Sequence, residues 1–96
     1  LMQKYKFKTA IQHFKTIIEM NPNHAIAHNS LGTALAEQGN FEEAIVHFQT
    51  SITINPRYLE AHQNLGTIFL ILGQPEQSVA HFKIAKEIAI NEKLKQ

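Results

Sequence analysis

The chain repeats itself with a period of 34 residues, the step that leads from Asn21 to Asn55. The recurring pairs are Asn21-Pro22 with Asn55-Pro56, Leu31-Gly32-Thr33 with Leu65-Gly66-Thr67, Gly39 with Gly73, and His47-Phe48 with His81-Phe82. The same step backwards reaches His13-Phe14, so the sequence holds two full units and the end of an earlier one. A period of this length, filled with helical patterns, predicts a stacked array in which each unit buries its apolar face against its neighbours.

The helices follow from the spacing of apolar residues and from the residues that interrupt it. Apolar side chains three and four positions apart mark one face of a helix, and the first such helix ends near Met20. Gly39 and Gly73 end two later helices, because glycine adopts the left-handed conformation found at helix ends. Pro75 opens the last helix, and since no glycine or proline follows it, we expect that helix to reach about Leu94.

These patterns predict an all-α fold of about five helices in one domain, residues 1–96. Residues 1–20 form the second helix of a partial repeat, residues 21–54 form a repeat, and residues 55–96 form a repeat with an extended last helix. The first helical pattern begins at the N-terminus itself, without a secretory signal before it. We therefore expect the chain to be part of a longer protein.

Composition excludes several classes of protein. The absence of cysteine removes disulfides and thiolate metal sites and fits a reducing compartment, so cytoplasm is the localisation we expect. The longest apolar run, Ile68 to Leu72, is far shorter than the roughly 20 residues that cross a bilayer, so no membrane association is predicted. Basic residues gather at both ends, and between Thr16 and Phe82 only Arg57 is basic. Because a continuous basic face is missing, nucleic acid is not an expected partner.

The recurring residues resemble the tetratricopeptide repeat, whose pattern combines Leu-Gly on the first helix with a small residue and an aromatic on the second. The matching positions are Leu31-Gly32, Ala44, Phe48 and Pro56 in one unit, and Leu65-Gly66, Phe69, Ser78, Phe82 and Ala85 in the next. The family pattern also has an aromatic residue before and after Leu-Gly on the first helix and a proline at the unit boundary. Here His28 and His62 stand at the first aromatic position, Leu35 at the second, and Ile90 at one boundary proline. The resemblance implies a right-handed superhelical stack of antiparallel helix pairs, an alpha-alpha solenoid.

The resemblance also implies that the first helix of each pair lines an inner groove. The predicted peptide-binding groove consists of Asn29, Ser30, Thr33, Glu37, Glu60, Gln63, Asn64, Thr67, Leu70 and Ile71. Side-chain amides both donate and accept hydrogen bonds, so they can hold the backbone of an extended peptide. Asn64 stands where the repeats of O-linked N-acetylglucosamine transferases carry a ladder of asparagines. The equivalent residue in the first unit is Ser30, with Asn29 beside it, so the ladder is incomplete. The alternative interpretation is that Asn64 only solvates an open face.

Two functions fit these features. The first is a non-catalytic scaffold for protein-protein interaction that binds an extended peptide or a partner helix in the groove. The alternative is a substrate-recruiting arm of a larger enzyme, such as a glycosyltransferase, with catalysis outside this chain. A carboxylate clamp for acidic chaperone tails is not expected, because the matching positions hold Asn29, Thr33 and Glu60 rather than cations. No catalytic residues are predicted, because the sequence has no nucleophile-base pattern and Glu42-Glu43 fits a helix first turn.

The six histidines fit repeat inheritance better than a metal site. His13, His47 and His81 are one period apart, and packed helices lie about 8–10 Å from each other, too far for successive imidazoles to share a metal. His24 and His28 are four positions apart but lack a third ligand. His28 and His62 are expected in the core. We predict neither a metal nor another cofactor.

The ends of the array are the last feature. The leading helix lacks its own partner, and the final helix lacks the polar cap that repeat arrays generally need. The residues expected at these open ends are Phe7, Ile11, Ile84, Ile88 and Leu94. The predicted partner is a protein or peptide, and a homo-oligomer formed through the uncapped terminal helices is a further hypothesis.

Overall fold

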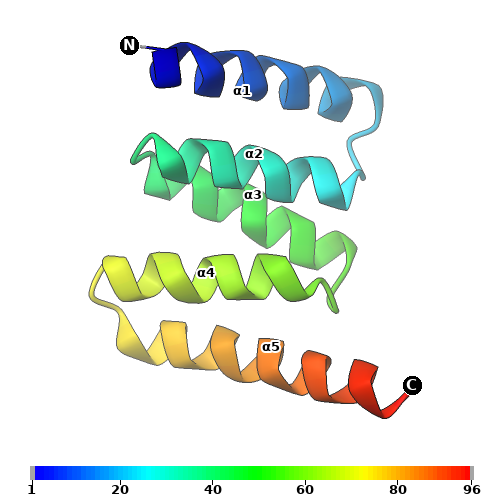
Figure 1. Ribbon diagram of the computed structural model, residues 1–96. Helices are drawn as coiled ribbons and strands as arrows, with labels where there is room; N and C mark the ends of the chain where they lie inside the picture. Colours follow the sequence, from blue (N-terminus) through cyan, green and yellow to red (C-terminus); the bar gives the residue numbers. More distant parts are fainter. Residues whose placement is uncertain (1, 96) are drawn as a thin grey trace.

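The computed structural model describes residues 2–95, with side chains from Lys6 onward. These residues form five helices and no strand: α1 (Met2–Met20), α2 (Ala25–Glu37), α3 (Phe41–Ile54), α4 (Leu59–Ile71) and α5 (Pro75–Leu94). Successive helices run antiparallel, and the molecule is a flat slab of 41 × 32 × 20 Å (Figure 1). Each helix packs on the next along the chain, and α2 also contacts α4. The all-α fold of stacked helix pairs is confirmed.

The two turns inside the helix pairs have the same geometry. Gly39 and Gly73 have φ angles of 82° and 73°, a left-handed conformation that other residues adopt only with strain. After each glycine the chain closes the preceding helix with a backbone hydrogen bond, from Asn40 N–H to the Leu35 carbonyl at 2.9 Å and from Gln74 N–H to the Phe69 carbonyl at 2.8 Å. The predicted helix ends at these glycines are confirmed.

The turns between units are also repeated. The side-chain oxygen of Asn21 accepts a hydrogen bond from the Asn23 backbone at 3.3 Å, and that of Asn55 accepts one from Arg57 at 3.2 Å. Pro22 follows the first of these asparagines and favours an extended residue before it, so α1 ends there. The asparagine and proline together therefore set the boundary between stacked units.

Small residues let the two helices of a pair come close together. A Cβ atom on Gly32 would lie 2.7 Å from the Phe48 ring, and one on Gly66 would lie 2.8 Å from the Phe82 ring. Ala44 is completely buried at the same contact. The core consists of Leu31, Leu35, Ala44, Phe48, Leu65, Ile68 and Phe69, with Ile11, Phe14 and Ile18 of α1 packed against it. Gly32 and Gly66 therefore allow a close approach of the two helices in each pair.

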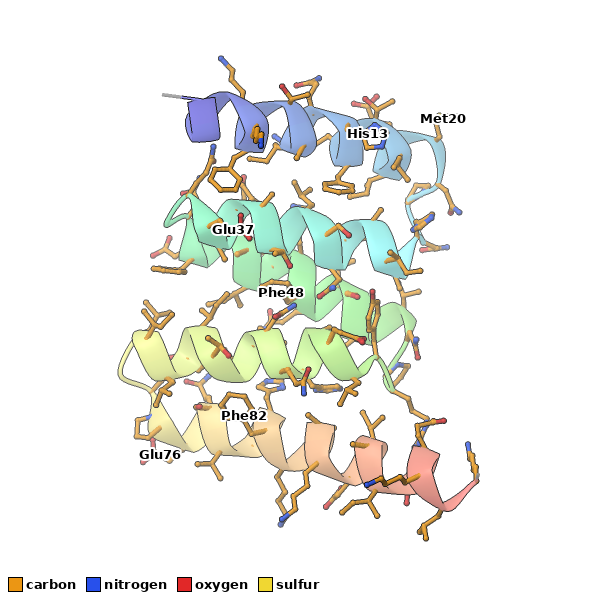
Figure 2. The ribbon with its side chains drawn as sticks, in the orientation of Figure 1. His13, Met20, Glu37, Phe48, Glu76 and Phe82 are labelled. Carbon is orange, nitrogen blue, oxygen red and sulfur yellow. The ribbon has the colours of Figure 1, made fainter. Side chains whose placement is uncertain are left out.

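The last helix has a partly exposed apolar face. It ends at Leu94 as expected, but Val79 is 64% exposed and Phe82 is 38% exposed, whereas Phe48 is 1% exposed. Phe48 lies between α2 and α4, while Phe82 is covered by α4 alone within the described residues (Figure 2). Phe82 therefore fills space within its own helix pair, whereas Phe48 fills space between one unit and the next.

The residues predicted at the open ends of the array differ in their exposure to solvent. Ile84 is 38% exposed and Leu94 is 80% exposed, whereas Ile88 is 5% exposed. Ile88 therefore belongs to the interior, and the prediction that it faces a partner is wrong. Within residues 2–95, no helix is both long and apolar enough to traverse a lipid bilayer.

Candidate functional site

The predicted groove residues lie on two helices that contact each other. Asn29, Ser30, Thr33 and Glu37 come from α2, and Glu60, Gln63, Asn64, Thr67, Leu70 and Ile71 come from α4. We call these ten residues the α2–α4 face. Asn29, Ser30, Thr33 and Asn64 are half-buried, and the other six are exposed. Both helices are amphipathic, because the sides of α2 and α4 opposite this face carry buried leucines of the core.

Two asparagines join the units across this face. The side-chain amide of Asn64 donates a hydrogen bond to the side-chain oxygen of Asn29 at 3.0 Å. Asn29 precedes Ser30, the residue that stands at the ladder position of the first unit. Asn29, one position before Ser30, is therefore the residue of the first unit that bonds Asn64.

A tyrosine lies near the same contact. Tyr58, the residue before α4, is half-buried close to Asn29. Burial raises the pKa of the Tyr58 hydroxyl, the charge of Glu60 raises it further, and the Asn29 side chain opposes both effects. Asn64 retains its carbonyl oxygen and one N–H for another partner.

The two threonines of the face are partly satisfied by their own helices. Thr33 donates its hydroxyl hydrogen to the Asn29 carbonyl at 3.0 Å, and Thr67 donates to the Gln63 carbonyl at 3.0 Å. A hydroxyl that donates in this way still has an oxygen lone pair. Both threonines can thus accept a hydrogen bond from a ligand, while Asn64 can donate and accept.

Two shallow hollows open on the face. The first, of about 410 Å³, lies between α1 and α2 and is lined by Lys6, Phe7, Ala10, Phe14, Asn29, Ser30, Thr33, Ala34 and Glu37. The second, of about 240 Å³, lies between α2 and α4 over α3 and is lined by Thr33, Ala36, Glu37, Phe41, Phe48, Asn64, Thr67, Ile68 and Ile71. Thr33 and Glu37 line both hollows, so they form the ridge between them. Figure 2 shows Glu37 at one end of α2.

The ten predicted groove residues do not all line the same hollows. Seven of the ten predicted residues line the hollows, whereas Gln63 and Leu70 line neither. Glu60 lines a separate hollow at the turns between units, together with Tyr58 and Arg57. The prediction missed the aromatic lining that the second helices supply. The sequence carried a signal for it, because Phe7 and Phe14 recur one period later as Phe41 and Phe48.

The histidines do not assemble a metal site among the described residues. No three side chains of histidine, cysteine, aspartate or glutamate come together there. The Nδ1 atom of His24 accepts a hydrogen bond from the Ala27 backbone at 3.0 Å, so this histidine caps α2. His28 and His62 are 6% and 4% exposed, which confirms that they belong to the core.

Comparison with known proteins agrees with this geometry. Two models of the tetratricopeptide repeat match the chain, over residues 25–58 and 47–80. No curated protein matches it. A crystal structure of MamA superposes with a TM-score of 0.88 at 27% identity, covering 95% of this chain and 53% of that one.

Other MamA structures superpose in the same way. One of MamA AMB-1 has a TM-score of 0.80 at 29% identity, covering 90% of this chain and 51% of that chain. MamA from Desulfovibrio magneticus RS-1 has a TM-score of 0.85 at 22% identity, covering 95% and 51%, and shows the common fold alone. The chain thus spans about half the length of these structures. Because the matched residues 25–80 include α2, α3, α4 and the contact between Gly32 and Phe48, the chain belongs to the tetratricopeptide repeat family.

Proposed function

We propose that the chain is a non-catalytic protein-interaction scaffold that binds an extended peptide along the α2–α4 face. One observation carries the proposal: unused hydrogen-bonding groups of Asn64, Thr33 and Thr67 lie beside two apolar hollows on the same face. An extended backbone needs donors and acceptors, because it has no internal hydrogen bonds. A face that offers both, next to hollows for side chains, suits such a ligand.

The chemistry of the face favours binding over catalysis. Its polar groups are amides and hydroxyls, and its only carboxylates are Glu37 and Glu60, which line different hollows. A general acid or base needs a reacting group within hydrogen-bond reach and a suitable pKa. No histidine lines either of the two hollows on the α2–α4 face. The face therefore offers hydrogen bonds and apolar contact to a partner protein or peptide.

The same face suits a second candidate function, recruitment of substrates for an enzyme domain elsewhere in a longer protein. The hydrogen bond between Asn29 and Asn64 favours substrate recruitment, because this bond forms a short row of asparagines across two units. A glycosyltransferase is the enzyme class that the resemblance suggests. Sequencing the parent gene beyond Gln96 separates the two candidates, since a catalytic domain there supports recruitment and further repeats alone support a scaffold.

Nuclear magnetic resonance of the isotope-labelled chain tests the proposal, after sedimentation has established its mass in solution. We expect a library of extended peptides to shift the amide signals of Asn29, Thr33, Asn64 and Thr67. Asn64→Ala should weaken binding. Gln49→Ala is the matched control, because Gln49 is exposed on α3 and lines neither hollow. Shifts confined to α1 and α5 would count against the α2–α4 face and for association through the terminal helices.

A further inference from the structure

The two hollows of the α2–α4 face are the same feature, one unit apart. Six of the nine residues in each lining correspond, one period apart: Phe7 with Phe41, Phe14 with Phe48, Ser30 with Asn64, Thr33 with Thr67, Ala34 with Ile68, and Glu37 with Ile71. In each hollow, two phenylalanines of a second helix lie behind a threonine of a first helix. The array therefore presents one apolar hollow at each boundary between stacked units.

The hollows are suited to side chains rather than to a whole small molecule. Their volumes of about 410 and 240 Å³ lie near or below the lower limit of ligand pockets, roughly 300–1,000 Å³. The second is lined by apolar atoms of Phe41, Phe48 and Ile68, while Ile71 at its edge is 59% exposed. An apolar side chain placed there would shield this exposed surface from water.

The distance between the hollows indicates the spacing of the anchors, the two ligand side chains that would fill them. They are displaced by one unit, and α2 and α4 are in contact, which places helix axes about 8–10 Å apart. In an extended polyproline II chain, residues three positions apart project from the same side at about 9 Å, because each residue advances about 3.1 Å. Residues two positions apart in a strand are separated by only about 7 Å. The spacing thus favours anchors at positions i and i+3.

The ridge between the hollows carries a negative charge. Glu37 lines both hollows, is exposed, and takes part in neither of the two ion pairs found in the described residues. Among the described side chains, the only cation in either lining is Lys6, at the first hollow. A ligand that spans both hollows must pass Glu37, so a basic residue between its two anchors would meet an opposite charge.

We infer that the α2–α4 face recognises a short extended segment of a partner protein, with apolar side chains at i and i+3 and a lysine or arginine between them. The inference rests on the proposed peptide-binding function and adds the ligand's pattern to it. The apolar anchors occupy the two hollows, the basic side chain pairs with Glu37, and the free groups of Asn64 hold the backbone. A helical segment is a poorer ligand, because its backbone groups are already hydrogen bonded to one another.

Titration calorimetry with four synthetic peptides tests the pattern. The first carries leucines three positions apart with a lysine between them, in a background of serine and threonine. The second has the same composition with the leucines two positions apart, the third replaces lysine by aspartate, and the fourth is an amphipathic helix. We expect the first to bind about tenfold more tightly than the second, the effect of losing one well-buried apolar side chain.

Variants of the chain locate the anchors. Ser30→Leu fills only the first hollow, and Ala36→Leu fills only the second, so each should weaken binding of the first peptide. Thr53→Leu is the matched control, because Thr53 is exposed on α3 and lines neither hollow. Glu37→Gln should remove the preference for lysine over aspartate and leave the spacing preference intact. Circular dichroism establishes that each variant is folded.

The outcomes separate the inference from the proposed function. Equal affinity for the two leucine spacings, with signals of the α2–α4 face still shifted, overturns the inferred pattern and leaves peptide binding standing. Preference for the amphipathic helix also overturns it. If none of the peptides, including the broader library, shifts the α2–α4 face, both the pattern and the proposed function are wrong.

Discussion

His28 of α2 and His47 of α3 are hydrogen bonded to each other through their Nδ1 atoms, which lie 3.1 Å apart, and His62 and His81 repeat the contact at 3.2 Å. The Nε2 atoms of His28 and His62 each bond a proline carbonyl, of Pro22 and Pro56, at 2.9 Å. A carbonyl only accepts, so Nε2 of the buried histidine carries the hydrogen and its Nδ1 accepts. The Nδ1 of His47 or His81 is then the donor.

This arrangement predicts that stability falls in mild acid. Burial, and then the neighbouring His28, lower the pKa of His47 below its ordinary value of 6.5, and burial and His62 do the same to His81. Glu43 opposes the shift at His47, and Lys15 adds to it. Because the unfolded chain then binds more protons, the free energy of unfolding should be highest above pH 6.5 and decline as the pH falls toward the lowered pKa values.

Urea unfolding at a series of pH values between 8 and 5 checks this expectation. The double variant His47→Gln and His81→Gln should have a flatter profile, since glutamine can still donate to the buried ring but does not titrate in this range. His13→Gln is the control, because His13 is exposed and belongs to neither histidine pair. Parallel profiles for the wild-type chain and the double variant would contradict the role of the histidine pairs.

The two equivalent phenylalanines should differ in their contribution to stability. Phe48 is 1% exposed, so Phe48→Ala should cost about 3–5 kcal/mol, the usual range for a buried aromatic. Phe82 is 38% exposed, so Phe82→Ala leaves a smaller cavity and should cost less. Denaturant unfolding of the two variants measures the difference. Equal losses would mean that Phe82 is covered in solution by something outside the described contacts.

Gly32 should not tolerate even a methyl group. Alanine is favoured over glycine in a helix by roughly 1 kcal/mol, but its Cβ would lie 2.7 Å from the Phe48 ring. We expect Gly32→Ala to be destabilising by about 1–3 kcal/mol, the range for overpacking. Adding Phe48→Leu should recover part of that loss, measured as a coupling free energy in a double-mutant cycle. A stabilised Gly32→Ala variant would show that the ring moves aside freely.

Each helix pair contains one buried serine, but not at the same position. Ser51 donates to the Ala25 carbonyl at 2.9 Å, and Ser78 donates to the Gly66 carbonyl at 2.8 Å. The equivalent positions, one unit later and one unit earlier, are Ala85 and Ala44, both buried. The fold therefore accepts alanine at either position, and Ser51→Ala and Ser78→Ala should each cost only about 0.5–1.5 kcal/mol in denaturant unfolding. Losses as large as that of Phe48→Ala would contradict this equivalence.

The sequence predicts helix ends and burial that depend on the local pattern of residues. It does not predict contacts that depend on how neighbouring helices are offset along their axes. Helix ends at Gly39 and Gly73 and the burial of His28 follow from spacing and repeat register. The bond between Asn29 and Asn64 does not, because the two residues are one position out of register and meet only through helix packing. The 64% exposure of Val79 on α5 likewise does not follow from periodicity, which contains no information about which neighbour covers a helix face.

The contact between Asn29 and Asn64 should be measurable as a coupling between units. The bond of 3.0 Å is half-buried, so the two side chains should contribute a coupling free energy of about 0.5–1.5 kcal/mol. A double-mutant cycle of Asn29→Ala and Asn64→Ala, followed by urea unfolding, isolates this coupling from the other contacts that each substitution removes. Gln63→Ala replaces Asn64→Ala in the control cycle, because Gln63 is exposed and lies beside Asn64 on the same helix. Additive losses in the first cycle would show that the asparagines do not stabilise the junction of the units, and that both amides are free for a ligand.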